Sequence, residues 1–242
     1  MSVLEHLEQK PIYPLEVGGV DLTITNGVIT LWTAALLVFV LFLALSRQLK
    51  PVPGKLQNLV EVVVLFLRDE VASQIVHGRE KWLPFIVAVF FFVLANNLLG
   101  LIPGMSSSTG NINVTAALAL IVFFVVQAAG VAKHGVIGYL VSLVPSGLPL
   151  PIAIFMFPVE LVSQLAKPFS LAVRLFANMF AGHAVMLMLI SLIFLFRSYL
   201  IVPLPVLGNT MVLTFEIFVC FIQAFIFTYL TTLYIATAVE GH

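Results

Sequence analysis

Residues 161–196 read LVSQLAKPFSLAVRLFANMFAGHAVMLMLISLIFLF and form one long apolar run. As a continuous helix this run would be about 54 Å long. A perpendicular crossing of a hydrocarbon core about 30 Å thick needs only about 20 residues. We therefore expect a membrane helix that tilts steeply or leaves the bilayer partway along its length.

Arg174 lies within this apolar run, where a charged side chain is difficult to accommodate. An arginine at a bilayer centre costs about 2.5–3.5 kcal/mol on insertion scales. Unlike lysine, it does not escape that cost by losing its charge. A favourable interaction with another group is therefore expected at this position.

The composition of the whole chain agrees with a membrane location. Of its 242 residues, 61% are hydrophobic and only 9% are charged, whereas about 25% are charged in an ordinary soluble domain. The eleven basic and eleven acidic residues balance, so no net charge favours nucleic acid as a partner. The single cysteine, Cys220, excludes an internal disulfide and is interpreted as a packing residue.

The apolar runs and the breaks between them predict an all-α integral membrane protein. It would have five transmembrane helices plus one amphipathic interfacial helix, with the last two transmembrane helices forming a long, steeply tilted hairpin. The predicted segments are an extracytoplasmic N-terminal segment at 1–26, transmembrane helices at 27–46, 82–102 and 114–133, the interfacial helix at 55–77, and long tilted membrane helices at 158–197 and 206–240.

Charges beside the first predicted span indicate its orientation. Arg47, Lys50 and Lys55 follow the uncharged stretch 27–46 directly, whereas the preceding segment is mainly acidic. The positive-inside rule places such a basic loop in the cytoplasm. We therefore expect the N-terminus outside and the C-terminus in the cytoplasm. Residues 1–26 resemble neither a cleavable signal nor a transit peptide, so we expect the chain to begin as written.

Glycine and proline residues predict where helices begin, bend or end. The stretch 135–151 is rich in both and predicts a short interfacial connection. Pro158 suits a helix start, whereas Pro168 predicts a kink within the long helix. Between residues 56 and 76, apolar side chains recur at helical spacing among charged ones, which indicates an amphipathic helix at the interface.

Polar residues are few in the last two helices, and their spacing assigns each one a side of its helix. Glu160, Lys167 and Arg174 are seven residues apart and so share one stripe. Asn178, four residues after the arginine, belongs to the same stripe. His183 lies about 180° round the helix from it. Structural roles stay open for two of these residues, a helix cap for Glu160 and snorkelling to the surface for Lys167.

A turn near residues 199 and 200 would bring residues of the two long helices to matching depths. It places His183 opposite Glu216 in an outer layer, where both side chains can titrate. Gln223 would then lie near Arg174 in an inner layer, about 10–14 Å deeper at the helical rise. Because no acid of this chain is expected beside Arg174, its partner is expected to be a carboxylate on another protein. A local hydrogen bond without proton transfer is the alternative for His183.

Three motifs together resemble one known family. They are ELVSQLAKPFSLAVRLFANMFAGH at 160–183, FEIFVCFIQAFIFTYL at 215–230 and NNLLGLIPG at 96–104. The first resembles the fifth-helix signature of subunit a of F-type ATP synthases, the stator half of the proton channel, and the second is similar to the other conserved helix of that family. With the length and topology, the resemblance covers nearly the whole chain.

The resemblance implies roles in proton translocation. Arg174 would face the carboxylates of the rotating ring of c subunits. The outer access channel would be lined by Asn178, His183, Glu216 and Gln223. The cytoplasmic side would be lined by Glu160 and Ser170. The histidine and glutamate are exchanged relative to many bacterial relatives, an arrangement similar to mitochondrial subunits. Gly100 stands where some bacterial members have an acid, so that position would not be a relay here.

The resemblance also implies partners and a location. The partners would be the c-subunit ring, the peripheral-stalk b subunits, other ATP synthase subunits and membrane lipid, with no nucleic acid, cofactor or metal. The chain would couple the proton gradient to ATP synthesis or the reverse without being catalytic itself, since a separate soluble sector carries out that chemistry. The bacterial inner (plasma) membrane is the expected location, with the mitochondrial inner membrane as the alternative. Na⁺ as coupling ion stays open.

Two other classes of protein stay open from the residues alone. A proton-coupled secondary transporter also uses intramembrane arginine, histidine and glutamate, but it usually has internal repeats, and none is visible here. An intramembrane hydrolase needs a nucleophile or a metal constellation. The sequence contains neither His-Glu-x-x-His nor Gly-x-Ser-x-Gly.

Overall fold

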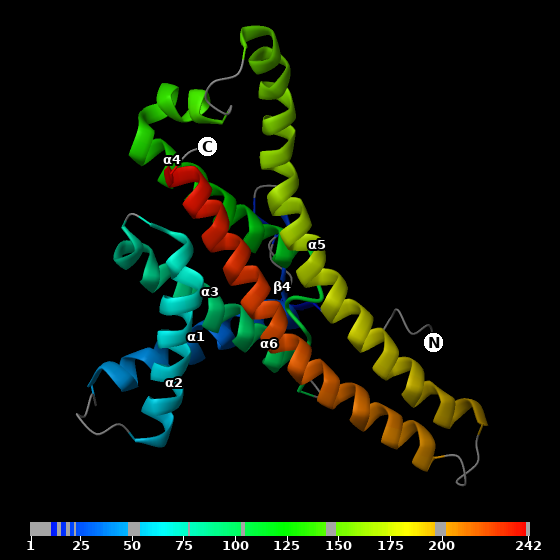
Figure 1. Cartoon of the computed structure of the whole chain (residues 1–242). Helices are drawn as coiled ribbons and strands as arrows, with labels where there is room; N and C mark the ends of the chain where they lie inside the picture. Colours follow the sequence, from blue (N-terminus) through cyan, green and yellow to red (C-terminus); the bar gives the residue numbers. More distant parts are fainter. Residues whose placement is uncertain are drawn as a thin grey trace. The chain divides into compact units, whose positions relative to one another are not determined.

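The computed structural model describes residues 11–13, 16–17, 20–21, 23–47, 54–76, 78–102, 105–143, 149–196 and 202–240 (Figure 1). Within these ranges, five helices are long and apolar enough to cross a membrane. They are α1 (Asn26–Arg47), α3 (Arg79–Gly100), α4 (Ile112–Ser142), α5 (Leu150–Phe196) and α6 (Pro203–Glu240). The predicted class, an all-α integral membrane protein, is confirmed.

Short strands are confined to the segment before the first helix. β1 (Pro11–Tyr13) pairs antiparallel with β4 (Ile24–Thr25), and β2 (Glu16–Val17) pairs antiparallel with β3 (Val20–Asp21). Both pairings are only two or three residues long, and the fold class rests on the helices that follow.

The segment predicted as an amphipathic helix, 55–77, is helical up to Gln74 in three consecutive pieces. α2 (Lys55–Phe66) is followed by a π-helical turn, η2 (Leu67–Val71), and a 3-10 turn, η3 (Ala72–Gln74). Val60, Leu67 and Val71 are buried, whereas Leu56 and Leu59 are about 60% exposed. One apolar side of this helical segment therefore packs within the chain, and another stays uncovered. Residue 77 lies outside the described part.

In the predicted interfacial connection at 135–151, residues 136–142 form a separate helical piece. α4 is interrupted at Gly135, whose φ of 72° and ψ of 166° are not helical, so α4 consists of two helical parts that meet at a kink. A φ of 72° is readily adopted only by glycine. Beyond the bend, the Tyr139 ring packs so closely on Gly130 that a Cβ there would overlap it. Gly135 therefore ends the first part of α4 close to the predicted boundary at 133, and residues 144–148 are not described.

The longest helix also begins earlier than predicted. α5 starts at Leu150, not near Pro158, and both Pro158 and Pro168 lie inside it. Pro151 occupies its first turn, where the missing N–H has no helical acceptor and costs little. At about 70 Å, α5 is longer still than the sequence suggested. The predicted hairpin turn near 199 and 200 lies outside the described residues.

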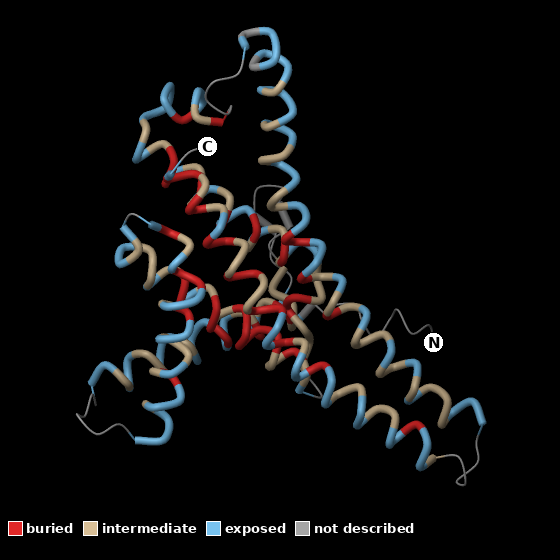
Figure 2. Tube along the Cα trace, viewed as in Figure 1, coloured by how far each residue is buried: buried red, intermediate tan, exposed pale blue. Residues whose placement is uncertain are grey.

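The chain packs as two units. The first contains Met1–Leu41, Phe91–Thr115 and Arg174–Ala224, and the second contains Phe42–Phe90, Ala116–Val173 and Phe225–His242. Along α5, buried positions are few and most residues are intermediate or exposed (Figure 2). This helix therefore depends on lipid or on other proteins to cover its apolar side chains.

Candidate functional site

In the first unit, residues 174–196 of α5 and 203–224 of α6 run side by side as a hairpin (Figure 1). Two glycine contacts give its register. A Cβ at Gly208 would lie 3.6 Å from Leu189, and a Cβ at Gly182 would overlap the carboxyl group of Glu216. This register agrees with the prediction that residues 183 and 216 lie at about the same depth.

His183 turns its imidazole ring toward backbone carbonyls. Its Nδ1 lies 2.8 Å from the Met179 oxygen in the preceding turn of α5. Its Nε2 lies 2.9 Å from the oxygen of Gly100, the last residue of α3. A neutral imidazole has only one N–H to donate, so both hydrogen bonds exist together only when the ring carries two protons. The ring is thus held by acceptors on both sides.

Gly100 has a part in this site that the sequence did not reveal. A Cβ at Gly100 would lie 2.8 Å from Ser107 Oγ and 2.9 Å from Met179 Cε, so a larger residue would require these side chains to move. The missing side chain lets the His183 ring reach the carbonyl group. The glycine itself was visible in the sequence, in the NNLLG stretch at 96–100. Sequence spacing does not show that the end of this helix meets the histidine.

Glu216 is buried against the backbone beside the histidine. The residue is only 8% exposed. The Oε2 atom of its carboxyl group has no hydrogen-bond partner among the described residues. The described ion pairs do not join it to His183. A buried carboxyl oxygen requires a proton, a water molecule or another polar group beside it. His183 and Glu216 therefore lie at about the same depth in the hairpin, but no described ion pair joins their side chains.

Arg174 is exposed on α5, whereas the adjacent Leu175 is fully buried. Ala177 and Ala181, one and two turns further along, are exposed as well. Within the described part of the chain, no carboxylate lies within ion-pair distance of the guanidinium. A permanent cation therefore lies on an uncovered helix face, with small side chains beside it.

The inner layer predicted around Arg174 is not joined by hydrogen bonds in the described chain. Gln223 is only 5% exposed, and its Nε2 has no partner there. Asn178 is half-buried. Each of these amides is positioned by its own helix, and neither is held by the arginine.

A second polar cluster lies in the other unit, around Glu160 and Lys167. The Lys167 Nζ is 3.8 Å from Glu160 Oε1, and Gln164 Nε2 donates a hydrogen bond of 3.1 Å to the same oxygen. Lys167 also lies 5.5 Å from the centre of the Tyr234 ring of α6. Because α5 begins at Leu150, Glu160 does not cap a helix, and that alternative is wrong.

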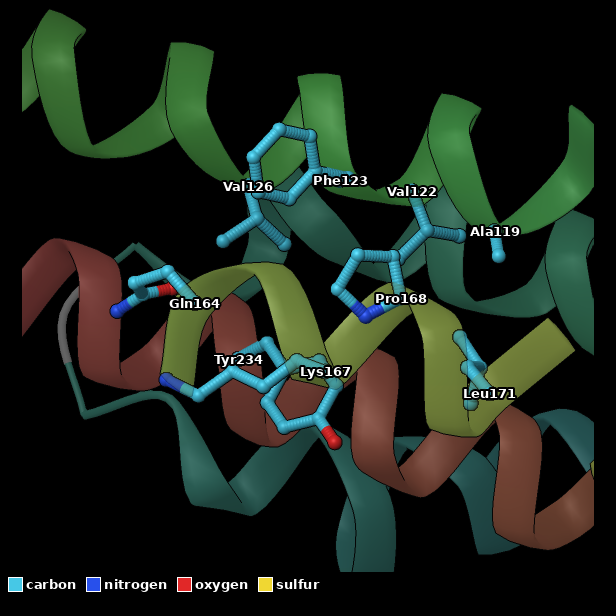
Figure 3. A pocket seen from close by; sticks show the side chains of 9 residues that line it. All are labelled: Ala119, Val122, Phe123, Val126, Gln164, Lys167, Pro168, Leu171 and Tyr234. Atoms are coloured by element: carbon cyan, nitrogen blue, oxygen red, sulfur yellow. The ribbon is translucent and has the colours of Figure 1, made fainter. Parts of the chain in front are cut away.

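Beside this cluster is a small cavity between α4, α5 and α6 (Figure 3). Its volume is about 10 Å³, close to the minimum for one water molecule. Lys167 and Tyr234 lie along one side, with Val122, Phe123 and Val126 of α4 on the other. Ser170 is exposed and does not line this cavity. In the described ranges, no three His, Cys, Asp or Glu residues are grouped to hold a metal ion.

These features define a multi-pass helical membrane protein whose last two helices carry an exposed arginine, a half-buried histidine, a buried glutamate and a buried glutamine. The family profile described as ATP synthase A chain matches residues 28–236. The chain belongs to this family.

Similar proteins cover nearly the whole chain. It is 44% identical over 236 residues to ATP synthase subunit a of Chloroherpeton thalassium, covering 94% of this chain and 71% of that protein. It is 44% identical over 235 residues to ATP synthase subunit a 2 of Prosthecochloris aestuarii, covering 93% and 72%. It is 42% identical over 253 aligned positions to ATP synthase subunit a of Magnetococcus marinus, covering 100% and 94%.

Proposed function

We propose that this chain conducts protons in a bacterial ATP synthase, through two offset half-channels at its contact with a rotating c-subunit ring. Membership of the ATP synthase A chain family supports a place in that complex. The observation that carries the proposal is Arg174, a permanent cation on an exposed face of an apolar helix with no described acid beside it. A carboxylate on a partner satisfies this arginine.

The arginine would act on each ring carboxylate as it passes. A carboxyl group moving through lipid is protonated, because a charge there is costly. A guanidinium beside it favours the ionised form, so the proton leaves when the site reaches Arg174. The exposed Ala177 and Ala181 support a close approach by a neighbouring helix, since methyl side chains leave space beside the arginine. The same fixed charge repels protons from a direct path between the half-channels.

The two polar clusters are candidates for the two half-channels. His183 and Glu216, with Asn178 and Gln223, would line the outer one. In the outer path, the unpartnered oxygen of Glu216 and the amide of Gln223 provide polar groups at which water and protons are stabilised. Glu160 and Ser170 would belong to the cytoplasmic path.

Separate half-channels would make the membrane potential available for rotation. One elementary charge moved through 100 mV yields about 2.3 kcal/mol. ATP would be made or hydrolysed in a separate soluble sector, with this chain non-catalytic. The peripheral-stalk b subunits would hold it still, and Arg47, at the end of α1, supports an outside N-terminus and a cytoplasmic C-terminus.

The test is replacement of Arg174 with Ala, Gln or Lys in the assembled complex. Vesicles carrying each variant would be given an imposed proton gradient, and ATP synthesis would be measured. We expect loss of synthesis with Ala and Gln, and a severe defect with Lys because a compact ammonium group lacks the guanidinium fork. Arg47→Gln, which removes an exposed arginine at the end of α1, is the matched control.

The controls separate failure of assembly from failure of function. Co-purification of the c ring and the stalk subunits with each variant shows whether the complex forms. Near-normal synthesis by an assembled Arg174→Ala complex would remove the proposal. A chain that purifies without any ring would instead favour a transporter.

A further inference from the structure

A cavity of about 540 Å³ lies in the second unit, and none of the residues assigned to proton transfer lines it. It is lined by Gly78, Lys81 and Trp82 at the beginning of α3, by Val125, Ala128, Ala129, Ala132 and Lys133 of α4, and by Val239 near the end of α6. Its volume is in the range typical of small-molecule sites, about 300–1,000 Å³. It thus offers room for a headgroup-sized ligand.

The charged residues that line this cavity are both basic. Lys81 and Lys133 are exposed, and the described ion pairs include neither of them. Glu240 borders an adjoining hollow that shares Lys133 and Val239. Its Oε1 accepts a 2.6 Å hydrogen bond from the Val76 N–H. Two lysines without a described partner therefore give the cavity a positive rim.

The rest of the cavity wall suits an apolar chain. Ala128 and Ala129 are adjacent in α4 and Ala132 lies about one turn further along. Their methyl groups occupy little of the cavity. Val125 continues this wall one turn deeper along the span. Trp82 is half-buried and begins the uncharged part of α3, a position typical of tryptophan at the membrane surface. The cavity is thus basic where α3 begins and where the apolar run of α4 ends, and it is apolar further in.

The geometry points to a binding site for an anionic phospholipid of the surrounding bilayer. The phosphodiester would lie between Lys81 and Lys133, and one acyl chain would follow the alanines toward Val125. Basic pockets between membrane helices are a known way of holding such headgroups. The volume holds a headgroup and the first part of the chains, so the tails would extend into the bilayer. This site does not depend on the proposed proton pathway.

The two tryptophans of the chain make a direct test possible. In a Trp32→Phe chain, Trp82 is the sole tryptophan. Its fluorescence, excited selectively at the red edge of the tryptophan band, reports from the cavity wall. The chain would be reconstituted in phosphatidylcholine vesicles containing brominated phosphatidylglycerol or brominated phosphatidylcholine as quenchers. We expect stronger quenching by the anionic lipid at equal mole fraction. Each of Lys81→Gln and Lys133→Gln should weaken its apparent affinity about fivefold, because one lysine near an anionic surface contributes about 1 kcal/mol.

Matched variants make every outcome decisive. Lys55→Gln removes an exposed lysine of α2 outside the cavity and should leave the preference unchanged. Lys133→Arg should retain the preference for the anionic lipid. A Trp82→Phe chain, in which Trp32 reports from α1, checks that each lysine variant is still inserted. Equal quenching by the two lipids, or an equal loss with Lys55→Gln, would overturn the proposal. Displacement by excess inorganic phosphate would identify a free-anion site and also overturn it.

Discussion

Gly182→Ala tests whether the position of the Glu216 carboxyl group matters to proton transfer. The added Cβ would occupy space now filled by the Glu216 carboxyl, with Glu216 Cγ at 3.2 Å. The three nearest atoms all belong to the Glu216 side chain, and none is backbone. The carboxyl group must therefore rotate away while the two helices keep their places.

The magnitudes predict a variant that folds but conducts poorly. Alanine in place of a mid-helix glycine stabilises by about 1 kcal/mol. Forcing a side chain off its rotamer costs about 0.5–1.5 kcal/mol. The free energy of unfolding should therefore change by less than about 1 kcal/mol. Proton-driven ATP synthesis should fall by at least about tenfold, since a proton-transfer group within reach contributes about 10²–10⁴-fold.

The assay compares Gly182→Ala with Gly208→Ala on the same hairpin. At Gly208 an added Cβ would meet Leu189 at ordinary contact distances of 3.6 and 3.7 Å, so that variant should be normal in both respects. Thermal unfolding in detergent and ATP synthesis in vesicles would be measured for each. Normal synthesis by Gly182→Ala would refute a role for this carboxyl position.

A second-site change distinguishes displacement of the carboxyl group from general damage. Glu216→Asp shortens the side chain by one methylene and makes room for the new Cβ. Combined with Gly182→Ala, it should recover more synthesis than the product of the two single defects predicts. Defects that simply multiply would mean that the two residues act independently.

Three further predictions follow from the hairpin and from α4. In a chain without its native cysteine, cysteines at 182 and 216 should cross-link readily on oxidation and cysteines at 174 and 216 should not, and the opposite pattern would contradict the register between Gly182 and Glu216. The double exchange His183→Glu with Glu216→His should retain more proton pumping than either single change, because each helix keeps one titratable group. A double variant no better than the combined single defects would rule out proton exchange between these two positions. Gly130→Ala should destabilise by about 1–3 kcal/mol, because its Cβ overlaps a packed aromatic ring; an unchanged melting temperature would show that the ring moves freely.

The sequence was sufficient for the membrane class and for the last hairpin. Uncharged runs long enough to cross a bilayer leave the backbone no stable alternative to helix, because unpaired amide groups in lipid are costly. The depth of Glu216 relative to residue 183 also followed from sequence, because an antiparallel pair with a short turn has a nearly fixed register. These properties depend on the length of each apolar run and on the spacing of residues within it, which can be read from a single stretch of sequence.

Helix boundaries needed the structure wherever glycine or proline had two possible roles. Gly135 and Pro158 both suggested a break, and α4 is indeed interrupted at the glycine, whereas α5 continues through the proline. Whether such a residue ends or bends a helix depends on what packs beyond it. For α4, that packing is the Tyr139 ring on Gly130, a contact that sequence spacing does not specify.

The amino-acid sequence by itself determined which residues within the apolar helices are ionisable: Arg174, His183, Glu216, Glu160 and Lys167 are all evident without coordinates. Only the tertiary structure decided what each of them faces. His183 meets the Gly100 carbonyl rather than the Glu216 carboxyl, and Glu160 pairs with Lys167 in place of capping a helix. Spacing along one helix fixes the side on which a residue lies, whereas its partner depends on packing against other helices, which no single stretch of sequence contains.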